Sequence, residues 1–149
     1  MNALHFVDTN LLVYGYDDSH PEKKDRANQI MKRLWEARAG RLSHQVLQEF
    51  YVTVTRKLNP FLPPSIARRE IQDLLEWNPR PVTADILKSA WRIEDRWKLS
   101  WWDSLIVASA LDCGAANLLT EDMQDGLRIH SLQILNPFSD GFDLTHLDG

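Results

Sequence analysis

The sequence has little of what many catalytic and membrane classes require. It contains one cysteine, Cys113, among 149 residues, so an internal disulfide and a cysteine-rich metal site are both excluded. No apolar run reaches the roughly 18 residues of a membrane span, and the start lacks the basic flank and long apolar stretch of a secretion signal. These absences favour a cytoplasmic protein in which Cys113 is a structural thiol.

Other absences narrow the chemistry. The five histidines show no zinc-ligand spacing, and the sequence has no Gly-rich phosphate loop and no Gly-x-Ser-x-Gly elbow. Basic residues are fewer than acidic ones: the sequence has 17 Lys and Arg against 21 Asp and Glu, which gives a net charge of −4. Domains that bind nucleic acid by bulk charge are usually basic. A nucleic-acid-binding role therefore requires that much of the negative charge be concentrated in a metal pocket.

The pattern that is present is that of one α/β domain spanning residues 1–149. Short apolar runs predict strands at 4–7, 80–83, 117–120 and 132–135, the last a candidate edge strand. A turn or short helix is expected at 10–16. Helical spacing predicts helices from Pro21 to a stop at Gly40, then over 46–58, 66–75, 86–97 and 103–113. Strands separated by helices favour a sandwich around a mostly parallel sheet.

Two acidic residues follow strands of this predicted sheet. Asp8 comes directly after the first strand, and Asp122 comes shortly after Leu119. Ligands of parallel sheets gather at the carboxyl ends of the strands, so the two carboxylates face one another if the strands are neighbours. Asp8 could equally cap the next helix.

Three further acids are less distinctive one by one. Glu49 shares a helix face with Val46, and the edge of an apolar stripe is its ordinary place. Asp103 completes a Ser-x-x-acid capping box that begins at Ser100, a role compatible with metal binding. Asp125 shares a face with Asp122 if 121–126 is helical, and is otherwise surface charge. Carboxylates that converge suit a hard cation such as Mg²⁺ or Mn²⁺ and phosphodiester hydrolysis.

The six tryptophans allow nucleobase stacking, above all at Trp101 and Trp102. Trp35, Trp91 and Trp97, however, lie on stripes with core-like spacing. Packing is therefore the favoured interpretation for each tryptophan.

Four short motifs occur in a particular order: Val7-Asp8-Thr9-Asn10, Gln48-Glu49-Phe50, Trp102-Asp103-Ser104-Leu105-Ile106, and residues 119–126 from Leu119 through Asp122 to Gly126. Over nearly the whole chain, their order and spacing resemble the PIN domains, and within these the VapC-like toxins of type II toxin–antitoxin pairs.

The resemblance implies a three-layer α/β/α fold, frequent homodimers and endoribonuclease activity that depends on Mg²⁺ or Mn²⁺. It implies that Asp8, Glu49, Asp103 and Asp122 form the metal site, with Asp125 a less constant contributor and with Thr9, Asn10 and Thr120 in supporting roles. The implied partners are an RNA substrate and a cognate antitoxin whose tail occupies the acidic pocket.

Two alternatives remain at this stage. The first is a noncatalytic RNA-binding or scaffold module with the same fold. The second is an aspartate phosphotransferase similar to haloacid dehalogenases, although these need a second Asp where this chain has Asn10. Residues 138–149 carry no motif and are expected to be a peripheral tail, either a disordered solvated end or a segment packed at a dimer or antitoxin surface.

Overall fold

The computed structural model describes residues 3–148 and contains one five-stranded sheet. The strands are β1 (His5–Val7), β2 (Gly40–Arg41), β3 (Asn117–Leu119), β4 (Arg128–Ile129) and β5 (Leu132–Leu135), in the spatial order β2-β1-β3-β5-β4. All neighbours are parallel except β4 and β5, which form an antiparallel hairpin. The predicted mostly parallel sheet is confirmed.

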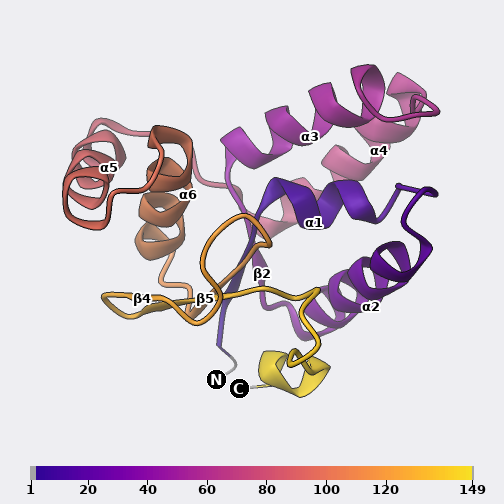
Figure 1. The fold of residues 1–149 in the computed structure, drawn as a ribbon. Coiled ribbons are helices and arrows are strands. Elements are labelled where there is room, and N and C mark those ends of the chain that lie inside the picture. Colours follow the sequence, from indigo (N-terminus) through magenta and orange to yellow (C-terminus); the bar gives the residue numbers. More distant parts are fainter. Residues whose placement is uncertain (1–2, 149) are drawn as a thin grey trace.

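Helices cover both faces of this sheet. They are α1 (Thr9–Tyr14), α2 (Pro21–Ala37), α3 (His44–Arg56), α4 (Pro64–Leu74), α5 (Ala84–Trp97) and α6 (Trp101–Asp112), with 3₁₀ turns η1 (Leu75–Trp77) and η2 (Leu144–Leu147). Figure 1 shows α5 and α6 on one side of the strands and α1 and α2 on the other, as expected for three layers. Within the described residues, no helix combines the length and apolar character needed to cross a membrane.

The strand predictions need three corrections. Strands β2 and β4 were not expected, and Gly40 lies in β2 rather than ending a helix, since α2 already stops at Ala37. The stretch 80–83 forms only a single bridge between Arg80 and Ser43, because α3 begins at His44 and the extended segment that pairs with it ends there. Strand β5 is not an edge strand, because β4 pairs along its outer side.

The tryptophans also depart from expectation. Trp35 is 45% exposed, Trp91 53% and Trp102 62%, so core packing was the wrong interpretation for these three. Trp101 and Trp97 are half-buried and do pack against the core. The stripes were read correctly as helical, but Trp35 and Trp91 lie at their solvent margins.

The C-terminal segment packs back onto the domain, which rules out a disordered solvated end for residues 138–148. Phe142 and Leu147 are buried. Arg26 on α2 donates from Nη1 to the carbonyl oxygens of Pro137 (3.2 Å) and Phe142 (3.3 Å). The buried His5 ring on β1 hydrogen-bonds through Nε2 to the carbonyl oxygen of Leu147 at 3.1 Å. The segment therefore belongs to the folded domain.

Candidate active site

The pairing of β1 with β3 places Asp8 beside Thr120. Val7 is in register with Leu119, and the Asp8 N–H donates to the Leu119 carbonyl at 3.1 Å. The Thr120 hydroxyl donates to Asp8 Oδ2 at 2.8 Å, and the Thr9 N–H donates to Oδ1 at 2.7 Å. Asp8 is only 5% exposed, so both oxygens of a buried carboxylate are held in place. Asp8 caps α1, as the alternative interpretation predicted, and its carboxylate also lies at the candidate site.

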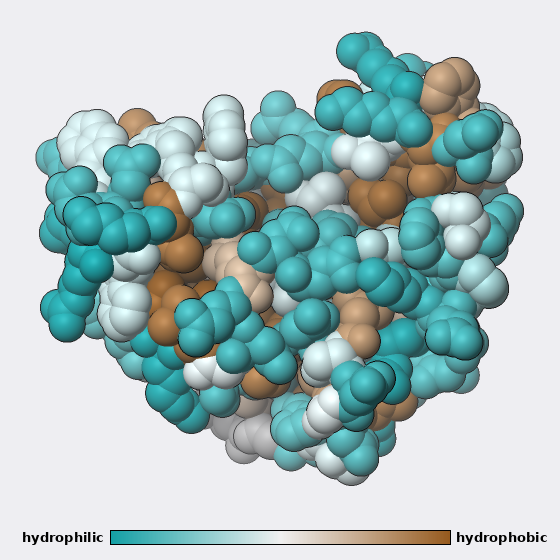
Figure 2. Space-filling view, in the orientation of Figure 1, coloured by the Kyte–Doolittle hydropathy of each residue, from teal (hydrophilic) through white to brown (hydrophobic). Residues whose placement is uncertain are grey.

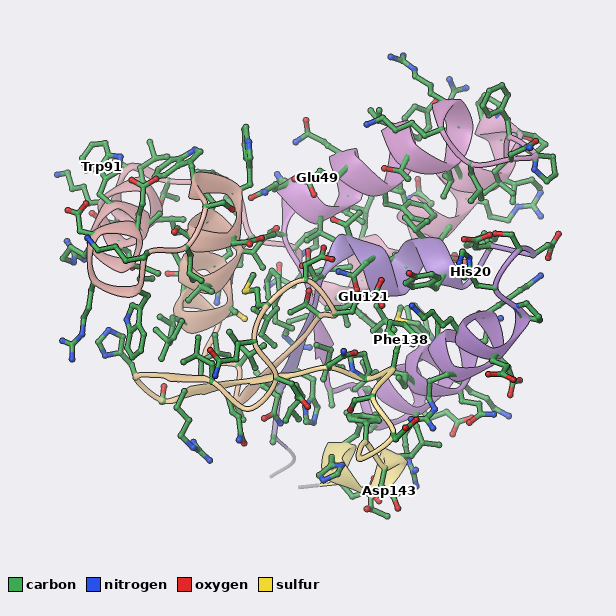
Figure 3. The ribbon with its side chains drawn as sticks, in the orientation of Figure 1. His20, Glu49, Trp91, Glu121, Phe138 and Asp143 are labelled. Carbon is green, nitrogen blue, oxygen red and sulfur yellow. The ribbon has the colours of Figure 1, made fainter. Side chains whose placement is uncertain are left out.

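A second acid, Glu49, is joined to this strand end through Thr9. The Thr9 hydroxyl donates to Glu49 Oε2 at 2.9 Å. Gln45, one turn earlier on α3, donates from Nε2 to Glu49 Oε1 at 2.8 Å. Figure 3 shows Glu49 in the first half of α3. Gln45 was not among the predicted site residues, although its i−4 spacing from Glu49 is a signal that could have found it.

Asn10 and Thr120 together hold Asp122. The Asn10 amide donates from Nδ2 to Asp122 Oδ2 and to Thr120 Oγ1, each at 3.0 Å. The Asp122 N–H donates to the same Thr120 oxygen at 3.1 Å. Because Thr120 Oγ1 accepts two hydrogen bonds, its own proton is directed to Asp8. Asp8, Glu49 and Asp122 thus belong to one hydrogen-bonded network through Thr9, Asn10 and Thr120, which we call the acid network.

Asp103 lies near this network without a hydrogen bond to its acids. It occupies the first turn of α6, where its N–H donates to Ser100 Oγ at 3.1 Å, which is one half of the predicted capping box. Burial raises the pKa of Asp103, and the charges of Asp122 and Glu49 add to the rise. Asp103 is therefore within electrostatic reach of both carboxylates.

Burial and the neighbouring carboxylates make Asp8 difficult to ionise. Burial raises the pKa of Asp8 to about 7. Hydrogen bonds from Thr120 and Thr9 oppose the rise, while the charges of Asp122 and Glu49 add to it. A carboxylate that resists ionisation in this way gains from a nearby cation.

Asp125 is placed differently. Residues 121–126 form bends and a turn rather than a helix, so the conditional helical face shared with Asp122 does not exist. The Asp125 carboxylate instead accepts from the Asn136 N–H at 2.8 Å. This contact ties the turn to the segment after β5.

Glu121, the neighbour of Asp122, was not predicted and has its own partners. It accepts a hydrogen bond from the Tyr14 hydroxyl and another from Lys23 Nζ at 2.9 Å. Lys23 also lies over the Tyr14 ring, 4.7 Å from its centroid. Figure 3 shows Glu121 beside α1. Lys23 therefore neutralises this acid, and a contact 98 residues apart in sequence gives no local signal by which to predict it.

The donor set fits a hard divalent cation in its chemistry. The four acids offer only oxygen atoms, which Mg²⁺ and Mn²⁺ prefer. In residues 3–148, no Lys, Arg or His forms an ion pair with Asp8, Glu49, Asp103 or Asp122. Over the same residues, no three acidic, histidine or cysteine side chains are grouped closely enough to enclose an ion as they stand. Binding would thus require the carboxylates to turn toward the cation from their present hydrogen bonds.

Two hollows meet at Glu49 and Gln48. The first, of about 730 Å³, has an apolar wall and a polar wall. The apolar wall is formed by Val82, Leu87, Trp101, Trp102 and Leu105, and the polar wall includes His44, Gln48 and Glu49. The second, of about 400 Å³, runs along α3 from Thr9 past Val52 and Thr53 to Lys57. In the space-filling view, apolar side chains show between polar ones in the recess between α6 and α3 (Figure 2).

Solved structures share this fold. A toxin–antitoxin complex from Klebsiella pneumoniae matches with a TM-score of 0.66 at 18% identity, over 90% of this chain and 98% of that one. The structure of VapBC2 from Rickettsia felis, bound to a DNA fragment from its promoter, matches with a TM-score of 0.60 at 18% identity, over 88% and 96%. VapC20 of Mycobacterium tuberculosis, a toxin that cleaves the sarcin–ricin loop, matches with a TM-score of 0.55 at 24% identity, over 76% and 86%.

Comparison with curated protein sequences found no significant match. The sequence matches the PIN domain over residues 5–124, a span that contains all four candidate acids. This match covers most of the chain, and the mostly parallel sheet with helices on both faces agrees with it. The chain belongs to the PIN domain family.

Proposed function

We propose that this protein is an endoribonuclease that depends on Mg²⁺ or Mn²⁺. Asp8, Glu49, Asp103 and Asp122 are the proposed metal ligands. The observation that carries the proposal is the acid network, in which carboxylates from three separate segments meet at the carboxyl ends of β1 and β3 without a cationic partner in the described part of the chain. Carboxylates collected in this way repel one another unless a cation joins them.

The chain's own residues have distinct tasks in this proposal. A bound divalent cation would supply charge for the phosphate and for the oxygen atoms that enter and leave. Thr9 orients Asp8 through its N–H and Glu49 through its hydroxyl. Asn10 and Thr120 hold Asp122 against Asp8. No side chain acts as the nucleophile, so phosphoaspartate chemistry at Asp8 is not part of the proposal.

The biological setting that we propose is a toxin–antitoxin pair of the VapBC type. The shared fold with toxins and toxin–antitoxin complexes supports this setting, as does membership of the PIN domain family. RNA is then the substrate, a small antitoxin is the partner that restrains cleavage, and the toxin itself forms homodimers.

The test is cleavage of a structured RNA pool by the purified protein with Mg²⁺ or Mn²⁺. EDTA should abolish cleavage. Substitutions D8N, E49Q, D103N and D122N should each slow cleavage by about 100-fold or more, since each removes a charged ligand of the cation.

Asp125→Asn is the matched control. It changes one Asp to Asn close to the site, and an Asn keeps the oxygen that accepts from the Asn136 N–H. We expect its rate to stay within a few-fold of wild type. If folded wild-type protein binds RNA without cleaving it in either metal, the noncatalytic RNA-binding alternative replaces the proposal.

A further inference from the structure

Trp102 is an exposed aromatic residue at the edge of the candidate site. It lies in the first turn of α6 and is 62% exposed, whereas the adjacent Trp101 is half-buried and packs against the core. Val82, which lines the same pocket, is 41% exposed. Large apolar side chains that are exposed together beside one pocket are typical of a contact surface.

The pocket has the two kinds of wall that a nucleobase requires. Its apolar wall, with Trp101, Trp102 and Leu105, suits the flat face of a base, and its polar wall on α3, with His44 and Gln48, suits the hydrogen-bonding edge. Its volume of about 730 Å³ is that of an ordinary small-ligand pocket. Gln48 Nε2 already donates to the His44 carbonyl at 3.3 Å, which leaves the Gln48 amide oxygen and the exposed His44 ring to meet a polar edge of the ligand.

The same pocket is continuous with the proposed metal ligands. Glu49 lines it, and Asp103 directly follows Trp102 in sequence. On the other side of Glu49, the hollow along α3 leads to the exposed cation of Lys57. An RNA strand that crosses Glu49 would thus meet an aromatic surface on one side and a positive charge on the other. The aromatic surface suits a base, and the positive charge suits a phosphate.

We propose that the pocket between α3 and α6 is a nucleobase subsite in which an unpaired base of the RNA substrate stacks on Trp102. This inference rests on the proposed function. It limits the substrate to RNA that is single-stranded next to the cleaved bond, because both faces of a paired base are covered by its neighbours in the helix. Lys57 contacts the backbone on the far side of that bond.

The experiment measures RNA binding by fluorescence anisotropy in Mg²⁺, in an Asp8→Asn background so that the probe stays intact. The probes are a fluorescein-labelled random single-stranded RNA 12-mer and a duplex of the same length. Trp102→Ala and Trp102→Phe are compared with Trp91→Ala, a matched control because Trp91 is also exposed but lies on α5 away from Glu49 (Figure 3). Cleavage of the RNA pool by the same tryptophan variants with Asp8 intact is measured in parallel.

We expect Trp102→Ala to weaken single-strand binding about 5- to 150-fold, the usual range for losing one stacked base. Trp102→Phe should lose less, Trp91→Ala should bind as the background does, and the duplex should not distinguish the variants. Equal binding by Trp102→Ala and Trp91→Ala overturns the inference, and if the wild-type chain still cleaves the pool, the proposed function survives this failure. A Trp102→Ala variant whose mass by light scattering falls while its RNA binding is unchanged would assign the pocket to a second copy of the chain instead. If no form binds or cleaves RNA, the proposed function and the inference both fail.

Discussion

Burial of the Asp8 carboxylate lowers the free energy of unfolding when no cation is bound, and the size of this effect depends on pH. The pKa of Asp8 is about 7 in the fold, against an ordinary value of 3.8 in the unfolded chain. Between these two values, the folded state holds a proton that the unfolded state releases, so Asp8 makes the free energy of unfolding fall as the pH rises through this window. Below about pH 4 this contribution vanishes.

We therefore expect Asp8→Asn to flatten the pH dependence of stability in EDTA. The gain over wild type should grow from near zero at pH 4 to about 4 kcal/mol at most at pH 8, since each pKa unit corresponds to about 1.4 kcal/mol. Urea unfolding across this pH range measures it. Asp125→Asn, which alters an exposed acid, should keep the wild-type slope. A constant difference between wild type and Asp8→Asn at all pH values would contradict the assignment.

Residue-level prediction worked where a local pattern exists. Asp8 and Asp122 each follow a strand, and the parallel pairing of β1 and β3 brings them together. Lys23 and Glu121 could not be paired in this way, because no local pattern relates positions that meet only in the folded chain. Which acids stay free of cations is thus a property of tertiary structure.

At the scale of the element, Gly40 allows the Trp77 ring to pack closely against β2. A Cβ at this position would lie 2.3 Å from the ring of Trp77, which packs directly over the strand. We expect Gly40→Ala to destabilise the protein by about 1 to 3 kcal/mol, the usual effect of overpacking a core. Chemical denaturation measures it, with Gly141→Ala as the control because nothing lies within 4 Å of a Cβ there. Equal stability of the two variants would show that the Trp77 ring moves aside freely.

The elements themselves were predictable in proportion to their length. Every helix with a clear apolar stripe was found, whereas β2 and β4 have two residues each, too few for any periodicity. The strand expected at 80–83 stops at a single bridge, because the segment opposite it turns into α3 directly after Ser43. Short strands exist only because a longer neighbour pairs with them.

At the scale of the whole molecule, the C-terminal segment is joined to α2 by two arginines of different kinds. Arg26 donates to two backbone carbonyls and lies 5.7 Å from the centre of the Phe142 ring, whereas Arg33 forms a surface ion pair with Asp148 at 3.3 Å. We expect Arg26→Ala to lower the free energy of unfolding by about 1 to 2 kcal/mol. Arg33→Ala should lower it by about 0.5 kcal/mol or less, because exposed ion pairs contribute little. Thermal unfolding that ranks the two variants in the opposite order would contradict this description of the segment.

The contact between His5 and Leu147 has a practical consequence. At the amino end of strand β1, His5 contacts Leu147, and at the carboxyl end of the same strand lies Asp8. An affinity tag, a fluorophore or a surface tether attached after Leu147 therefore begins near the amino end of β1, whereas the acid network lies at the carboxyl end. An immobilised form of the protein tethered at that end would leave the acids facing the solution, so the RNA cleavage that we propose could be tested on the bead.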